Sequence, residues 1–220
     1  FGQFILGMRW APLADTPSYG IFPMIVASLY VTALSTLIGV GIGLFTAVCL
    51  YKFCPRKLVA PIRQMVNLLA GIPSVIYGLF GMTVIVPFIR DHVSPRGVGY
   101  GILSSSLVLA IMVLPTVVSV SLDAMRAVPE SYYEGALALG ATKEAATFRV
   151  MLPAAKSGIL AGVVLAVGRA LGETMAVMMV MGNANLFPRL LGKGETIASL
   201  IALEMGTAEA GSLLDRDLGI

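Results

Sequence analysis

Long apolar stretches alternate with short polar segments along this chain. Residues 16–51, 64–89 and 97–122 contain no Lys, Arg, Asp or Glu, and residues 157–188 contain only two charged side chains. A bilayer-spanning helix needs roughly 20 predominantly apolar residues, whereas helices of soluble domains average about 11–12 residues. The pattern therefore predicts an all-α polytopic membrane protein. The predicted spans are about 22–51, 64–89, 97–122 and 157–182.

Composition supports the membrane assignment. The 220 residues are 57% hydrophobic and 12% charged, whereas soluble domains carry about 25% charged residues. The net charge of +3 is better explained by basic cytoplasmic loops than by binding to nucleic acid. Cys49 and Cys54 match no metal-ligand spacing, so we expect no metal site.

The distribution of basic residues predicts the orientation. Loops 52–63 and 123–156 each contain four Lys or Arg residues, whereas loop 90–96 contains two. The positive-inside rule then places the two more basic loops in the cytoplasm. Residues 1–21, which are rich in aromatic and turn-forming residues, become an extracellular interfacial segment, and residues 189–220 become an outer loop.

The loop 123–156 is long enough to contain structure of its own. Ser131-Tyr132-Tyr133-Glu134 has the pattern of a capping box, and Gly140 can end the resulting helix in a left-handed cap. Thr142 can cap a second helix over 143–152, which Pro153 closes. Two short helices of this kind either form a knob for a soluble partner or lie on the lipid headgroups.

Three groups of residues in this loop resemble the "EAA" loop of ABC importer permeases. They are Glu134-Gly135-Ala136, then Gly140, then Val150-Met151-Leu152-Pro153. Gly135 and Val150 depart from the family pattern, which has Ala and Ile at these positions. In that family the loop forms a coupling helix that docks in a groove of the ATP-hydrolysing subunit. The resemblance assigns this contact to Glu134, Ala136, Gly140, Leu152 and Pro153.

Two further stretches narrow the resemblance. Residues 69–78 and 168–177 are similar to the phosphate-uptake (Pst) permeases, and residues 174–177 with 181–183 are more similar to PstC-like than to PstA-like subunits. The resemblance implies a type I ABC importer permease fold, also called MetI-like.

The resemblance also implies a domain organisation. A transmembrane permease domain would cover residues 22–188. Four to five of the family's six spans would be present in this chain, and the outer loop 189–220 would lead to a final span beyond it.

The same resemblance implies a function. The chain would be the membrane pathway of an ATP-driven inorganic phosphate importer in a prokaryotic plasma membrane, surrounded by lipid. Its expected partners are a homodimeric PstB-like ATPase, a PstA-like permease and an extracytoplasmic PstS-like phosphate-binding protein. No G-x-x-x-x-G-K-[ST] motif occurs here, so ATP and Mg would bind the ATPase, and we expect no catalytic residue in this chain.

Arg169 and Glu173 are the two charges of the fourth predicted span, one helical turn apart. An arginine at the centre of a span costs about 2.5–3.5 kcal/mol on insertion scales, which suggests a function. Its forked guanidinium fits two phosphate oxygens. The Glu173 carboxylate can accept a hydrogen bond from a protonated phosphate oxygen, which sulfate lacks near neutral pH. A structural ion pair is the alternative.

Two prolines inside predicted spans, Pro73 and Pro115, predict helix breaks near the pathway, because proline removes a backbone donor. Two other functions remain open at this stage. An ABC permease for sulfate or molybdate would share most of these features. An ion-coupled secondary transporter can also place Arg and Glu inside a membrane.

Overall fold

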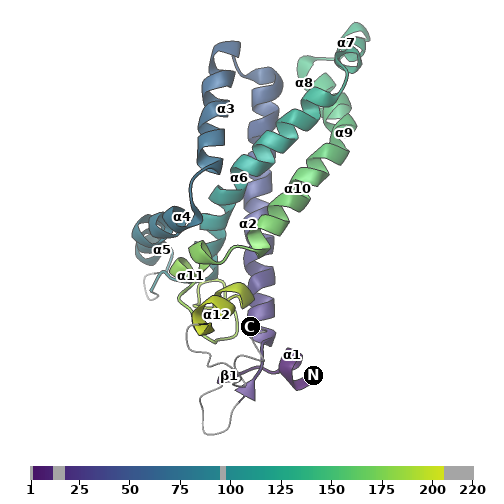
Figure 1. Cartoon of the computed structure of the whole chain (residues 1–220). Helices are drawn as coiled ribbons and strands as arrows, with labels where there is room; N and C mark the ends of the chain where they lie inside the picture. The colour runs from purple at the N-terminus through teal and green to yellow at the C-terminus, as the bar shows by residue number, and fades with distance from the viewer. Residues whose placement is uncertain (1, 12–17, 95–97, 206–220) are drawn as a thin grey trace. The chain divides into compact units, whose positions relative to one another are not determined.

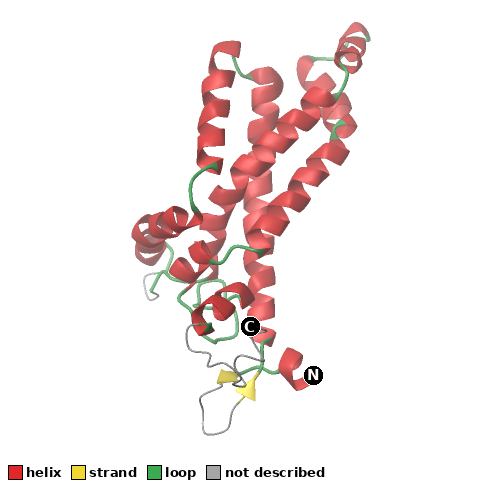
Figure 2. Cartoon of the chain, viewed as in Figure 1, coloured by secondary structure: helices red, strands yellow, loops and turns green. Residues whose placement is uncertain are grey.

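The computed structural model describes residues 2–11, 18–94 and 98–205, which are mostly helical (Figure 2). Within these residues three helical stretches are long and apolar enough to cross a membrane: Phe22–Phe53, Ser74–His92 and Ile102–Ala127. A fourth results if Lys143–Ala154 and Lys156–Leu171, which are bent by 68° relative to each other, form one broken span. The chain is therefore a multi-pass helical protein.

The chain divides into two compact units. The first unit comprises residues 1–35, 73–109 and 171–220, and the second comprises residues 36–72 and 110–170. The long helices α2 (Phe22–Val48) and α6 (Ile102–Ala127) each contribute to both units.

The first unit consists mainly of short elements. Besides its parts of α2 and α6, it contains α1 (Gly2–Leu6), β1 (Trp10–Ala11), β2 (Ser18–Tyr19), α4 (Ser74–Phe80), the π-helical turn η2 (Gly81–Ile85), α5 (Val86–His92), α11 (Met175–Met181) and α12 (Ile197–Glu204). The strands pair antiparallel, and the buried Trp10 ring meets Tyr19 edge-on at 5.7 Å. Helices α4 and α11 approach closely at Gly78, where a Cβ would lie 2.6 Å from the Met179 sulfur.

The second unit is built from longer helices around a continuous apolar core. Besides its parts of α2 and α6, it contains the π-helical turn η1 (Cys49–Phe53), α3 (Arg56–Ala70), α7 (Glu130–Ala138), α8 (Lys143–Ala146), the π-helical turn η3 (Thr147–Met151), α9 (Leu152–Ala154) and α10 (Lys156–Leu171) (Figure 1). Leu122 and Met125 of α6 are fully buried in this core.

Glycines set the spacing of helices in the second unit. A Cβ at Gly43 would lie 2.9 Å from Val117, so only glycine allows α2 to approach α6 this closely. Gly158 plays the same part between α10 and α6, because a Cβ there would lie 2.5 Å from the Ala124 methyl group. Small residues that bring backbones together are typical of helix contacts in membranes.

The second predicted span differs most from the structure. Helix α3 begins at Arg56, inside the predicted cytoplasmic loop 52–63, and ends at Ala70. Gly71, Ile72 and Pro73 interrupt the helix, and α4 begins at Ser74 with Pro73 as its N-cap. The predicted break at Pro73 is therefore present, and it separates two helices.

The predicted break at Pro115 is wrong. Helix α6 is continuous from Ile102 to Ala127 with Pro115 inside it. Proline removes one backbone donor, but a long membrane helix keeps its bonds on both sides of that position, and neighbouring helices can compensate for the loss.

The C-terminal segment contains an ordered helix instead of a plain loop. Thr196 caps α12 by accepting a hydrogen bond from the Ser199 amide, and the Ser199 hydroxyl accepts one from the Thr196 amide. Residues 206–220 lie outside the described residues.

Candidate coupling and substrate sites

The loop 123–156 folds into a short helix, a glycine cap and a second helix. Helix α7 ends in a Schellman motif: the Gly140 amide donates to the Leu137 carbonyl and the Ala141 amide donates to the Ala136 carbonyl. Gly140 has a φ of +85°, which a residue with a side chain rarely adopts. The predicted left-handed cap is confirmed.

The next turn is fixed by a second cap. The Ala145 amide donates a hydrogen bond of 3.2 Å to the Thr142 hydroxyl, so Thr142 caps the second helix as predicted. The predicted capping box at Ser131 is wrong, because α7 begins two residues earlier than such a cap requires, at Glu130, with Pro129 at the N-cap and no side-chain cap. Proline fixes its own φ near the helical value, so its position determines where the helix starts.

One side of α7 is anchored to the end of α2. Tyr133 is 8% exposed and packs with Ala146 and Met151 in a small apolar cluster. Lys52 lies over the Tyr133 ring at 4.1 Å, and its ammonium forms an ion pair of 2.5 Å with Glu130. Tyr133 and Glu130 therefore tie the coupling helix to η1. Sequence reasoning missed this pair, since 78 positions separate the two charges.

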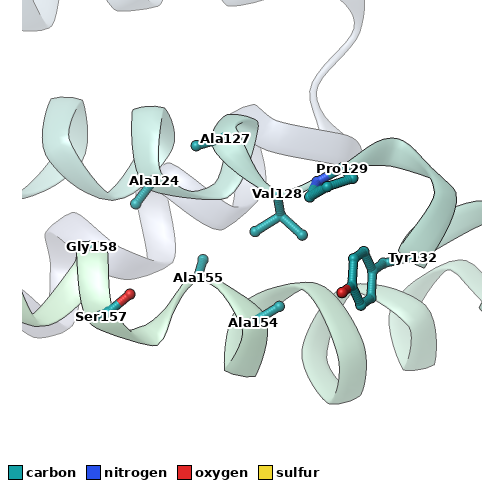
Figure 3. A pocket seen from close by; sticks show the side chains of 9 residues that line it. All are labelled: Ala124, Ala127, Val128, Pro129, Tyr132, Ala154, Ala155, Ser157 and Gly158. Carbon is teal, nitrogen blue, oxygen red and sulfur yellow. The ribbon is translucent and has the colours of Figure 1, made fainter.

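The other side of α7 borders a cavity. Tyr132 points into a cavity of about 320 Å³ between the end of α6, the start of α7 and the α9–α10 corner (Figure 3). The remaining walls are mainly small side chains, among them Ala124, Ala154 and Ala155. Adjacent tyrosines thus face opposite ways, one into packed core and one into open space.

The tip of the loop is exposed and apolar. Leu139, directly before the glycine cap, is 91% exposed. Of the residues predicted to contact the ATPase, Glu134, Gly140 and Pro153 are exposed, whereas Ala136 and Leu152 are partly buried. Ala136 packs against the Tyr133 cluster, and Leu152 packs against the core of the second unit. The signal for Leu139 was present in the sequence, because a residue next to a left-handed glycine is at a helix end and has few neighbours.

Arg169 lies in the last turn of α10, not at the centre of a span as predicted. Its side chain is half-buried. Helix α10 ends two residues later at Leu171, because the chain leaves the helical path at Gly172. A cation in the last turn is favoured by the helix dipole, which offsets part of the cost of placing a charge there.

Glu173 is not on the helix that carries Arg169. It lies in the non-helical segment between α10 and α11, so the predicted one-turn spacing on a single helix is wrong. Its Oε1 accepts a hydrogen bond of 3.1 Å from the Ala176 amide in the first turn of α11. The carboxylate therefore holds the start of α11, and no hydrogen bond from the described residues is found at Oε2.

These features define the class of protein. Residues 16–203 match the family described as the inner membrane component of binding-protein-dependent transport systems. The chain belongs to this family of ABC transporter permeases. It is a permease and not an enzyme, and members of the family work with an ATPase and further permease subunits.

Two curated relatives are similar over almost the whole chain. A probable ABC transporter permease protein, YqgH of Bacillus subtilis, is 39% identical over 98% of this chain and 70% of its own length. The phosphate transport system permease protein PstC of Mesorhizobium japonicum is 38% identical over 98% of this chain and 71% of its own length.

Solved structures support the fold. An inward-facing structure of the MetNI methionine ABC transporter matches with a TM-score of 0.69 and 21% sequence identity, covering 89% of this chain and 85% of the matched one. A second crystal form gives a TM-score of 0.67. The predicted type I ABC importer permease fold is confirmed.

Proposed function

We propose that this chain is a PstC-like permease subunit that forms part of the pathway of an ATP-driven inorganic phosphate importer. The observation that carries the proposal is the similarity to phosphate permeases such as PstC of Mesorhizobium japonicum, which covers 98% of the chain. This breadth includes both the coupling loop and the segment around Arg169.

Arg169 and Glu173 are the proposed substrate residues. Non-helical backbone at membrane depth is tolerated only where it is buried in protein or lines a water-filled cavity, and residues 172–174 interrupt the helix beside Arg169. The guanidinium would bind two phosphate oxygens. Glu173 would accept a hydrogen bond from a protonated phosphate oxygen through Oε2, while Oε1 holds α11.

The coupling loop is the proposed contact with the ATPase. Leu139 adds an exposed apolar side chain to the predicted contact residues, and burial of such a side chain stabilises protein contacts. The anchor of Lys52 to Glu130 and Tyr133 supports a rigid link from the loop to α2. The anchored loop would then transmit movement of the ATPase to the transmembrane helices.

The proposed assembly contains three kinds of partner. A homodimeric PstB-like subunit would bind ATP and Mg, a PstA-like permease would complete the pathway, and an extracytoplasmic PstS-like protein would deliver phosphate. The complex would lie in a prokaryotic plasma membrane with loops 52–63 and 123–156 on the cytoplasmic side. Because the two proposed substrate residues carry opposite charges, we expect the partner permease to supply further donors or cations for the anion.

Uptake into proteoliposomes tests the function. The complete transporter is reconstituted with the binding protein and radiolabelled phosphate on the same side of the membrane. Phosphate is expected to accumulate on the opposite side only with ATP. Unlabelled sulfate or molybdate should compete weakly. Strong competition by either oxyanion at equal concentration would favour the alternative of a permease for that anion, and accumulation without ATP would favour an ion-coupled carrier.

A further inference from the structure

A basic cavity at the end of α2 is distinct from the proposed substrate residues. It has a volume of about 530 Å³ and lies between η1, the first half of α3 and the end of α6. Three cationic side chains line it, namely Lys52, Arg63 and Arg126. No acidic residue is among its lining residues, and its volume is in the range typical of small-molecule sites.

The charges around this cavity do not cancel. Asp123 pairs with Arg63 at 2.8 Å, and Glu130 pairs with Lys52. Both carboxylates are more than half exposed and stand outside the cavity lining. Arg126 has no ion pair with any other residue that the structure describes, so one positive charge is left over.

The cavity also offers unused hydrogen-bond donors. Arg63 uses one terminal nitrogen for Asp123, and Lys52 uses one of its three donors for Glu130. The Arg126 guanidinium has five donors in a planar fork, a geometry that matches the oxygens of a phosphate group. An anion in this cavity could therefore be held by several charge-assisted hydrogen bonds.

The position of the cavity indicates where its ligand comes from. η1 ends the apolar stretch Phe22–Phe53, and Arg126 lies in the last turn of α6, so Lys52 and Arg126 stand at the ends of two candidate spans. By the predicted orientation these are the cytoplasmic ends. Basic pockets between transmembrane helices on that side bind anionic lipid headgroups. Inorganic phosphate leaving the transporter would reach the same place.

We propose that Arg126, Arg63 and Lys52 form a binding site for a phosphate group, carried either by an anionic lipid or by inorganic phosphate. This site goes beyond the proposed transport function and needs neither Arg169 nor Glu173. Occupied by a lipid, it would fix the ends of α2 and α6 at the membrane surface beside the coupling helix. Occupied by inorganic phosphate, it would sense the product of uptake.

The two cysteines of the chain provide a direct test. Cys54, which follows the π-helical turn η1, lines the cavity, whereas Cys49, at the start of that turn, does not, and both are free thiols. Labelling by a neutral maleimide, followed for each cysteine by peptide mass spectrometry, reports occupancy at Cys54 with Cys49 as an internal reference. The intact detergent-purified complex is labelled with short-chain phosphatidylglycerol, with phosphatidylcholine of the same chain length, or with inorganic phosphate against chloride at equal ionic strength.

The expected result is slower labelling of Cys54 with a phosphate-bearing anion and no change at Cys49. Protection by phosphatidylglycerol alone identifies a lipid headgroup as the ligand, and protection by inorganic phosphate alone identifies the free anion. In Arg126→Ala, the ligand concentration needed for half-maximal protection of Cys54 should rise about five- to tenfold, which is the effect of losing one cation near an anionic surface. Arg126→Lys should recover part of it.

Lys57→Ala is the matched control, because Lys57 is exposed on α3 and does not line the cavity. The proposal is overturned if neither anion protects Cys54, if Arg126→Ala is protected as well as the unchanged protein, or if Lys57→Ala loses as much protection as Arg126→Ala. If the thiol of Cys54 does not react at all, native mass spectrometry replaces the labelling. The amount of phosphatidylglycerol that stays bound is then compared between the unchanged protein, Arg126→Ala and Lys57→Ala.

Discussion

Two regions of this chain depart from plain apolar helix, and they do so in different ways. In the coupling loop, bonds between close neighbours fix the turn at Gly140 and the cap at Thr142. In the interruption between α10 and α11, two side-chain bonds are present: the Ala176 amide donates to Glu173, and the Thr174 hydroxyl donates a long bond of 3.4 Å to the Gly172 carbonyl. The hydrogen bonds that shape the loop are formed within the loop itself. In the interruption, by contrast, one oxygen of the Glu173 carboxylate has no hydrogen bond from the described residues and is available to a ligand.

This difference corresponds to the two proposed roles. A segment that transmits force must keep its shape, so its caps and its anchor to η1 are satisfied within the chain. A segment that binds a hydrated anion must offer groups that the protein itself has not used. Each of the following substitutions tests one side of this comparison.

The largest effect is expected at Glu173. In Glu173→Gln the side-chain oxygen can still accept from Ala176, but the amide that replaces Oε2 can donate to sulfate. Because unpaired buried polar groups make such discrimination strong, we expect the preference for phosphate over sulfate to fall about tenfold or more. Uptake measured with both anions in competition provides the ratio. An unchanged melting temperature would show that the cap on α11 is kept, and an unchanged ratio would exclude Glu173 from discrimination.

Leu139 tests the contact surface of the loop. Truncation of an interface side chain that contributes strongly costs more than about 1 kcal/mol, so Leu139→Ala should weaken retention of the ATPase subunit roughly tenfold. Folding should be unaffected, since the side chain is 91% exposed. Leu190→Ala, at a 53% exposed leucine of the first unit, is the control. Equal retention of the ATPase by both variants would remove Leu139 from the interface.

Two glycines of the loop form a matched pair. At Gly140, with φ of +85°, alanine should destabilise the loop by about 1–2 kcal/mol. At Gly135, which is inside α7 and has open space around a built Cβ, alanine should stabilise the helix by up to ~1 kcal/mol. Thermal unfolding of the two variants should therefore shift in opposite directions. Shifts of the same sign would mean that the cap geometry does not control the stability of the loop.

A pH dependence is expected in the first unit. Burial, with a contribution from Glu204, raises the pKa of Glu195 from 4.5 to about 7. The folded state then keeps a proton that the unfolded state releases, so stability is greatest below about pH 4.5 and falls until about pH 7. Glu195→Gln should flatten the melting temperature across this range and raise it at the alkaline end. A parallel curve for the variant would show that Glu195 does not carry the effect.

Sequence patterns predicted the helical stretch Phe22–Phe53 well, because the uncharged span 22–51 leaves helix as the only way to satisfy the backbone in lipid. Local caps at Gly140 and Thr142 were also predictable, since they depend on residues a few positions apart. The pairing of Lys52 with Glu130 was not, because it depends on how α2 and α7 fold back together.

The helix interruptions show the limits of local reasoning most clearly. Pro73 separates α3 from α4, whereas Pro115 lies inside the continuous helix α6. In the first case Gly71 precedes the proline and its amide bonds back to the Leu68 carbonyl, which ends α3 before Pro73 is reached. In the second case no glycine precedes the proline within several residues. The end of α10 at Leu171, directly before Gly172 and with no proline nearby, was not predicted at all.

The central claim is that Arg169 binds the transported phosphate. It is tested most directly by ATP-driven phosphate uptake in proteoliposomes containing the intact transporter with Arg169→Ala or Arg169→Lys, normalised to the amount of assembled complex. We expect Arg169→Ala to lose uptake by at least about tenfold, the effect of removing a charge-assisted hydrogen bond, and Arg169→Lys to keep part of it, because the charge remains without the fork. Uptake at the level of the unchanged protein in Arg169→Ala would contradict the claim.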